Sequence, residues 1–202
     1  MMDKIITMAH GSGGEETNNL IKDIFYRYLK NDELMQQGDA TILKEVKGKI
    51  ATSIDGFVVN PVFFPGGDIG KLSICGTVND ISVRGAHPLY IMCSFIIEEG
   101  LAVSDLEKIV QSMSETAEKC GVKVVAGDTK VVEKGKCEKV YISTCGIGEF
   151  RKKSDMLEIS SIKSRDKIIL SGPIGEHGMC IMNERYHLII DSSICSDCAP
   201  LD

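Results

Sequence analysis

Apolar residues recur at helical spacing in three stretches of the chain. The first follows the glycine-rich segment 10–14 (HGSGG), and the second covers residues 69–81 after the turn 65–68 (PGGD). The third begins at residues 104–107 (SDLE), a pattern typical of a capping box, and Gly121 is its expected end. Because apolar positions three and four residues apart share one helical face, these stretches predict amphipathic helices.

Five other apolar runs have the length and the flanking turns of β-strands: residues 41–46, 49–54, 88–97, 122–126 and 140–147. The first two flank the turn 47–48 and predict a β-hairpin. The third is nearly continuous in apolar residues and predicts a buried strand. We expect the fourth to end at residues 127–128 (GD), and residues 131–132 to form another strand before a Lys-Gly-Lys turn.

The composition becomes polar and basic at residues 151–164, and we place a domain boundary there. The first domain is then residues 1–153 and the second is 154–202. In the second, residues 167–170 predict a strand, and 171–175 (SGPIG) predict a turn into a helix. About 40 residues are few for a stable domain, so we expect the second domain to be incomplete in this chain.

Composition and charge exclude several classes of protein. Hydrophobic residues make up 43% of the chain and aromatic residues 5%, without tryptophan, so the core must be aliphatic. The net charge of −6 argues against nonspecific nucleic-acid binding, because phosphate contacts need a basic surface. No apolar window approaches the ~18 residues of a membrane span, and the start lacks a secretory pattern. We therefore expect a cytoplasmic protein that binds neither nucleic acid nor membrane.

The eight cysteines do not indicate disulfides in a reducing compartment. Four stand in apolar runs and are expected to be small buried side chains: Cys75, Cys93, Cys145 and Cys180. Cys195 and Cys198 form one CxxC pattern, without a second pair or a histidine at ligand spacing after it. Two free thiols near a turn explain this pattern better than a zinc or redox site.

Five aspartates are predicted to stand where strands or helices end in tight turns: Asp39, Asp55, Asp68, Asp80 and Asp128. Carboxylates gathered beside a polyphosphate would attract Mg²⁺, which prefers oxygen ligands and bridges protein to phosphate. Each aspartate taken alone is better explained as a turn or cap residue. The set as a whole is what favours a metal–phosphate site.

Two glycine-containing segments and one histidine are further candidates for chemistry. Segment 66–71 (GGDIGK) is not a P-loop, because its spacing is one residue short and Leu72 replaces the hydroxyl residue that binds Mg²⁺. Its turn can still offer backbone N–H groups to an anion. Segment 127–130 (GDTK) places Lys130 where an ammonium can neutralise phosphoryl charge, although a solvated lysine explains it equally well. His177 is a candidate base or anion ligand, and a structural histidine is the simpler interpretation.

Together these motifs resemble the HypE family, and the resemblance covers nearly all of the chain. It rests on these segments: 10–14 (HGSGG), 55–61 (DGFVVNP), 63–71 (FFPGGDIGK), 75–80 (CGTVND), 127–132 (GDTKVV), 175–179 (GEHGM) and 196–201 (SDCAPL). The string FFPGGDIGK is specific to HypE. The aspartates are shared with aminoimidazole ribonucleotide synthetase, thiamine-monophosphate kinase and selenophosphate synthetase.

The resemblance implies an α/β (α+β) fold, with a PurM-like amino-terminal domain and an incomplete α+β carboxy-terminal domain. The amino-terminal domain would carry a four-stranded mixed sheet and flanking helices, would form a homodimer through a barrel of two sheets, and would bind ATP near that interface. The implied activity is nickel–iron hydrogenase maturation. HypF carbamoylates a carboxy-terminal cysteine, ATP drives its dehydration to a thiocyanate, and the cyanide passes to iron on the HypC–HypD complex.

By motif match, the resemblance implies roles for individual residues. The implied ligands of Mg²⁺ are Asp39, Asp55, Asp80 and Asp128, converging around the triphosphate in the folded dimer. The implied ATP-binding residues are Gly66, Gly67, Asp68, Asn79, Gly127, Asp128 and Thr129. Lys130 and His177 are the candidate catalytic residues. The proton acceptor stays open among Glu149, Glu176 and a residue outside this sequence.

One departure from the family concerns the acceptor cysteine, which lies in a Pro-Arg-Ile-Cys-like tail at the extreme carboxy terminus. This chain ends in Ala199-Pro200-Leu201-Asp202, so we expect it to be inactive alone. Two alternatives remain: another ATP-dependent member of the superfamily, such as a small-molecule kinase or synthetase, or a dimerisation and docking module without catalysis.

Overall fold

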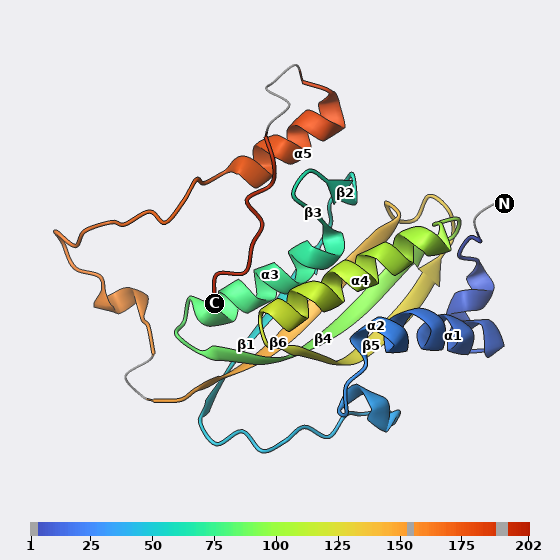
Figure 1. Cartoon of the computed structure of the whole chain (residues 1–202), viewed down its shortest axis with the longest axis horizontal. Helices are drawn as coiled ribbons and strands as arrows, with labels where there is room; N and C mark the ends of the chain where they lie inside the picture. The colour runs from blue at the N-terminus through green and yellow to red at the C-terminus, as the bar shows by residue number, and fades with distance from the viewer. Residues whose placement is uncertain (1–3, 153–155, 189–193) are drawn as a thin grey trace.

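A four-stranded mixed sheet with helices on one face forms the main body of the molecule (Figure 1). The computed structural model describes residues 4–152, 156–188 and 194–202. The sheet order is β1-β6-β4-β5, in which β6 is antiparallel to both of its neighbours and β5 is parallel to β4. The strands are β1 (Lys49–Phe57), β4 (His87–Glu98), β5 (Lys123–Val132) and β6 (Val140–Phe150). The predicted mixed sheet with flanking helices is therefore confirmed.

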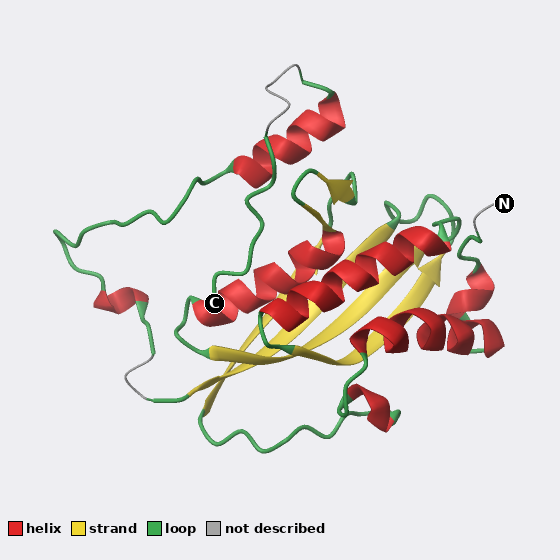
Figure 2. Cartoon of the chain, in the orientation of Figure 1, coloured by secondary structure: helices red, strands yellow, loops and turns green. Residues whose placement is uncertain are grey.

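Three helical segments cover the same face of this sheet (Figure 2). They are the continuous stretch α1 (Glu15–Leu20), η2 (Ile21–Phe25) and α2 (Tyr26–Leu29), then α3 (Ile69–Ser82), and then α4 (Val103–Lys119). Shorter elements connect them: η1 (Met8–Gly11), η3 (Leu34–Gln36), β2 (Phe63–Phe64) and β3 (Gly67–Asp68). All three predicted helices in this part of the chain are confirmed, and Gly121, at φ +65°, follows α4 as expected.

The hydrophobic core lies between the sheet and these helices, and it is mostly aliphatic as predicted. Phe95 on β4 meets Phe25 edge to face, with ring centroids 5.0 Å apart, and joins η2 to the central part of the sheet. Ile109 and Met113 on α4 and Val78 on α3 are fully buried. The periodicity of the sequence thus placed the correct helix faces inward.

The predicted hairpin between residues 41–46 and 49–54 is wrong. Only the second run is a strand, and β1 pairs with β6, which lies about 90 residues later in the chain. Thr41 is instead anchored at β5, where its Oγ1 donates to the carbonyl of Val125 at 2.8 Å. Because β5 and β1 form opposite edges of the sheet, the chain must cross the sheet between them. The side-chain amide of Gln36 donates a hydrogen bond to the carbonyl of Ile42 and accepts one from its N–H.

Two predicted boundaries also differ from the structure. Helix α4 begins at Val103 and has no side-chain cap, because its N-cap residue is Ala102 and the predicted cap Ser104 already lies within the helix. The carboxylate of Glu107 accepts hydrogen bonds from Arg27 and Tyr28. The strand predicted to end at residues 127–128 continues through Val132 as β5, since β4 offers backbone partners along its whole length. Asp128 is therefore a residue within a strand rather than a turn residue.

In the second predicted domain, α5 (Glu176–Tyr186) follows the predicted turn. The strand predicted at residues 167–170 is wrong. Ile168 and Ile169 are 98% and 90% exposed, and no described neighbour pairs with this run, so its apolar pattern alone does not make a strand. A short helical turn, η5 (Ile159–Ser161), precedes it. The domain boundary placed between residues 153 and 154 lies outside the described residues and remains a prediction.

The sheet face opposite the helices is open in the part of the chain that is described. The register places Ile54, Cys145 and Met92 side by side on this face, and Ile96 beside Tyr141. Ile54 is 76% exposed. Across the described ranges, no helix has the length and apolar content needed to cross a membrane.

Candidate functional site

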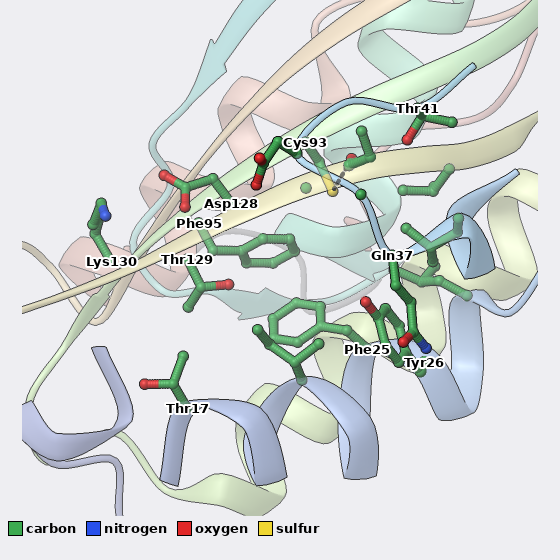
Figure 3. Close-up of a pocket in the computed structure, with 18 of the residues that line it drawn as sticks. Thr17, Phe25, Tyr26, Gln37, Thr41, Cys93, Phe95, Asp128, Thr129 and Lys130 are labelled. Atoms are coloured by element: carbon green, nitrogen blue, oxygen red, sulfur yellow. Dashed lines mark hydrogen bonds between the residues drawn. The ribbon is translucent and has the colours of Figure 1, made fainter. Parts of the chain in front are cut away.

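A pocket of about 350 Å³ lies beside β5 and is formed by segments that are far apart in the sequence (Figure 3). They include the glycine-rich start with the following helix, residues 37–41, Cys93 and Phe95 of β4, and residues 126–130 of β5. In Figure 3, Thr129 and Lys130 lie toward one end of the pocket, and Tyr26 and Gln37 lie toward the other. The pocket thus has polar and charged groups at one end and an aromatic side chain at the other.

The wall of residues 31–41 is fixed to β5 by side-chain hydrogen bonds. Asn31 Nδ2 donates to the carbonyl of Val124 at 2.7 Å, just as Thr41 binds the next carbonyl. Lys123 Nζ forms a 2.7 Å ion pair with the buried carboxylate of Glu33. The hydrogen bond from Lys123 lowers the pKa of Glu33, so this carboxylate stays charged. These bonds engage two backbone carbonyls and one side chain of β5 and keep the wall in place.

Glycines allow the backbone to form part of the pocket wall. A Cβ on Gly11 would lie 2.7 Å from the backbone nitrogen of Val131, and one on Gly127 would lie 3.2 Å from the carbonyl oxygen of Cys93. Gly13 has φ +81°, which favours glycine, and its N–H donates to Thr17 Oγ1 at 3.0 Å. A side chain at Gly11 would separate the start of the chain from β5.

The residues of segment 127–130 alternate between the two faces of β5. Gly127 and Thr129 pair with Cys93 and Phe95, whose side chains face the helices, so these residues line the interior of the pocket. Asp128 and Lys130 point to the opposite side of the strand, toward the open face of the sheet, as Figure 3 shows. The charged groups therefore form the rim of the pocket on the open side.

The structure brings five of the predicted site residues to this pocket: Asp39, Gly127, Asp128, Thr129 and Lys130. Mg²⁺ in nucleotide sites is often held by one or two carboxylates together with phosphate oxygens. Asp39 and Asp128 supply two carboxylates, and Lys130 supplies a positive charge. Among the described residues, no group of three or more histidine, cysteine or acidic side chains could hold a metal by itself. This donor set fits a metal–phosphate group better than a protein-only metal site.

Asp55 and Asp80 do not join this pocket. Asp55 lies within β1 and Asp80 within α3, rather than at the turns that the sequence predicted. Asp55 faces the helices, where its Oδ2 accepts a 3.0 Å hydrogen bond from Thr77 Oγ1, and Asp80 Oδ2 accepts one from Ser53. Asp55 and Asp128 are therefore on opposite faces and opposite edges of the sheet. The expected convergence of Asp55, Asp80 and Asp128 does not occur within one chain.

Gly66, Gly67 and Asp68 form the β2–β3 turn and the start of α3, and they do not line this pocket. Asp68 is a helix cap. Its Oδ1 accepts from the N–H groups of Gly70 at 2.7 Å and Lys71 at 3.1 Å. The backbone donors that the sequence offered to an anion are thus already occupied by a carboxylate.

Asn79 and His177 both contact the last residues of the chain. Asn79 Nδ2 donates to the carbonyl of Ala199, and its Oδ1 accepts from the N–H of Leu201. The Nδ1 atom of His177 lies 2.9 Å from Ser196 Oγ. The two predicted catalytic residues, Lys130 and His177, are not brought together, and their catalytic roles remain predictions.

Sequence reasoning missed most of the pocket wall. Asn31, Thr41 and Glu33 are polar residues in a connecting segment, and nothing local marks their contacts with β5. Gly11 and Gly13 belong to the glycine-rich start, and the position of this segment directly before a helix was the sequence feature that pointed to them. The CxxC cysteines are free thiols, as interpreted. Cys75, Cys93 and Cys180 are buried as predicted, whereas Cys145 is only half-buried.

Comparison with known proteins places this chain in a family. The sequence profile described as "AIR synthase related protein, N-terminal domain" matches residues 37–150. The chain is 45% identical over 198 residues to the carbamoyl dehydratase HypE of Rhizobium leguminosarum bv. viciae, covering 97% of this chain and 56% of that protein. It spans a little over half the length of the curated relatives that it matches.

Two solved structures of HypE are similar to the chain. A hydrogenase maturation protein HypE in complex with ATP has a TM-score of 0.82 and 42% identity, covering 96% of this chain and 57% of that one. A HypE–HypF complex has a TM-score of 0.73 and 49% identity, covering 90% and 58%. The chain therefore belongs to the family of AIR synthase related proteins, and among them it is similar to the HypE carbamoyl dehydratases.

Proposed function

We propose that this chain carries the ATP-binding part of an ATP-dependent carbamoyl dehydratase that acts in nickel–iron hydrogenase maturation in the cytoplasm. The observation that carries the proposal is the β5 pocket, a glycine-bordered cavity that Asp39, Asp128 and Lys130 all line. The resemblance to HypE proteins, one of which was solved in complex with ATP, supports the same ligand.

In this proposal each group at the pocket has a distinct role. Bound ATP supplies the phosphoryl group that makes the oxygen of a cysteine S-carboxamide a good leaving group. Asp39 and Asp128 would hold Mg²⁺ beside the phosphates, and Thr129 offers a hydroxyl inside the pocket. The ammonium of Lys130 neutralises negative charge at the rim. Phe25 and Leu29 give the other end of the pocket an apolar wall for a base.

We also propose that two copies of the chain form a dimer through the open faces of their sheets. Exposed apolar side chains on this face support it: Ile50, Ile54 and Ile96 are 60%, 76% and 39% exposed. Asp128 and Lys130 point toward the same face, so the pocket rim would lie at this interface. Asp55 and Asp80 can act as predicted metal ligands only if the second copy completes their surroundings.

The proposed partners of the protein are HypF, which donates the carbamoyl group, and the HypC–HypD complex, which receives cyanide. A solved HypE–HypF complex supports the first of these. The proton acceptor in the dehydration stays undecided between Glu149, Glu176 and a residue outside this sequence.

Calorimetric titration of the chain with Mg²⁺ and a nonhydrolysable ATP analogue tests the pocket. We expect saturable, Mg²⁺-dependent binding that Asp39→Asn and Asp128→Asn each weaken by about tenfold or more, as expected when a metal site loses a partner. The matched control is Asp105→Asn, which changes a half-buried carboxylate in the first turn of α4, away from the pocket, that pairs with Lys108. Unchanged affinity in Asp128→Asn contradicts the proposed site. Partner binding that ignores Mg-ATP would instead favour a docking module.

A second experiment tests the reaction. The full-length protein is incubated with HypF, carbamoyl phosphate and ATP, and the mass of its carboxy-terminal peptide is then measured by mass spectrometry. We expect a carbamoylated cysteine that loses one water when ATP is present. A carbamoylated peptide that never loses water would exclude the dehydratase and leave another ATP-dependent reaction of the superfamily.

A further inference from the structure

The last residues of the chain lie along α3, as the terminal segment in Figure 1 shows. One anchor is the N–H of Ser196, which donates to the carbonyl of Pro65 at 2.8 Å. The other is Asn79, whose side chain binds the backbone of Ala199 at 3.0 Å and of Leu201 at 2.8 Å. Residues 196–201, here called the terminal strap, are thus held at both ends, with Cys198 between the anchors.

Helix α3 presents Cys75 to this strap. Lys71, Cys75 and Asn79 are spaced four residues apart, so they share one face of the helix, and Asn79 fixes that face toward the strap. Cys198 directly precedes Ala199, whose carbonyl accepts from Asn79 one helical turn after Cys75, so the anchored strap brings the two thiols to the same face of α3. Cys75 is 2% exposed, whereas Cys198 is partly accessible to solvent.

The surroundings give the two thiols different reactivity. The hydrogen bond with Cys75, and then the positive charge of Lys71, lower the pKa of Cys198 against the effect of burial. The same hydrogen bond, and burial, raise the pKa of Cys75 well above its usual range. The partly exposed thiol therefore forms the thiolate more easily, and the buried thiol is held beside it.

We propose that Cys75 and Cys198 are a redox modification site, at which a peroxide converts the thiol pair into a reversible disulfide that ties the terminal strap to α3. Neither cysteine takes part in the proposed dehydratase reaction, so this redox site is independent of that reaction. Because Cys75 and Cys198 are far apart in the sequence, one disulfide would link the terminal strap to helix α3 of the sheet domain.

The chemistry balances with one peroxide for each disulfide. The thiolate of Cys198 attacks one peroxide oxygen, the O–O bond breaks, and a sulfenic acid forms as water leaves with the proton released from the thiol. The sulfur of Cys75 then attacks the sulfenic sulfur, the S–S bond forms and the S–O bond breaks, and the hydroxyl group takes the proton of the Cys75 thiol and leaves as a second water. Two thiols are oxidised and one peroxide is reduced. A dithiol reductant reverses the reaction by thiol–disulfide exchange.

Peptide mapping tests the site in the complete 202-residue chain. The protein is treated with hydrogen peroxide, its remaining thiols are alkylated, and it is digested with trypsin without reduction. We expect a cross-link between peptides 72–84 and 186–202, two fewer free thiols than in untreated protein, and recovery of both thiols after dithiothreitol.

Three variants identify the bonded atoms. Cys195→Ser is the matched control, because Cys195 lies in the same peptide and is exposed, and it should keep the cross-link. Cys75→Ala and Cys198→Ser should each lose it, with circular dichroism confirming that the variants fold. A Cys195–Cys198 bond within peptide 186–202 would overturn the proposal. So would a bond between two chains, oxidation of Cys198 beyond the sulfenic acid without a cross-link, or no loss of thiols.

Discussion

Thr77 links the predicted metal ligand Asp55 to the core, and replacing it tests the hydrogen-bond chain that orients this carboxylate. Thr77 is 0% exposed, and its Oγ1 lies 3.0 Å from Asp55 Oδ2 and 2.5 Å from Thr144 Oγ1. The one hydroxyl proton of Thr77 goes to the carboxylate, which can only accept. Thr144 must therefore donate to Thr77, and the chain runs from Thr144 through Thr77 to Asp55.

The direction of this hydrogen-bond chain sets the expected losses in the free energy of unfolding. A hydrogen bond to a charged acceptor contributes about 1.5–3 kcal/mol and a neutral one about 0.5–1.5 kcal/mol. Thr77→Val removes both bonds and should therefore lower the free energy of unfolding by about 3 kcal/mol, whereas Thr144→Val removes only the neutral bond and should lower it by about 1 kcal/mol. Because both variants break the same bond, the double variant should cost about 1 kcal/mol less than their sum. The corresponding fall in Tm is about 2–4 °C per kcal/mol for a chain of this size.

Urea unfolding followed by circular dichroism measures these differences, with a constant m-value showing that the unfolded states are comparable. The matched control is Thr116→Val, which changes a threonine that is 4% exposed and donates only to the carbonyl of Ser112 in its own helix. If Thr77→Val costs no more than this control, Thr77 does not support Asp55. If Thr144→Val costs more than Thr77→Val, the deduced direction of the chain is wrong.

Three further predictions concern the pocket and its supports. Gly11→Ala should destabilise the protein by about 1–3 kcal/mol, because its Cβ would lie 2.7 Å from the backbone nitrogen of Val131. A free energy of unfolding in urea within about 0.5 kcal/mol of wild type, the usual range of surface substitutions, would refute the close approach. Lys123 lowers the pKa of Glu33, so the pair stabilises the fold above the ordinary carboxyl pKa, and this contribution is lost as pH falls through the lowered value. Glu33→Gln should therefore flatten the dependence of the free energy of unfolding on acid pH. A curve for this variant that runs parallel to the wild-type curve would contradict the prediction. Burial raises the pKa of Cys93 to about 12, so iodoacetamide at pH 8 should label this thiol only after unfolding, and rapid labelling of the native protein would show that the site opens.

Local pattern was enough to predict several elements of this protein. Apolar residues at intervals of three and four predicted the inward faces of α3 and α4, and the continuous apolar run predicted the strand β4, of which only the face toward the helices is buried. These helix faces and this strand can be predicted locally, because each depends on residues that are close together in the sequence. Residues 41–46 had a similar pattern and are not a strand, because a strand needs a partner that the local sequence does not contain.

The site depended more strongly on tertiary structure. Segment 127–130 was a correct candidate, but the continuation of β5 decided that Thr129 faces the pocket and Asp128 the open side of the sheet. The aspartates looked equivalent in the sequence, whereas the fold made Asp68 a helix cap and bound Asp55 to Thr77. The sequence by itself determined the helix faces, the central strand and the motifs of the family. Only the fold decided which carboxylates share a cavity, because strand pairing and side-chain contacts between distant segments set the face and the partner of each residue.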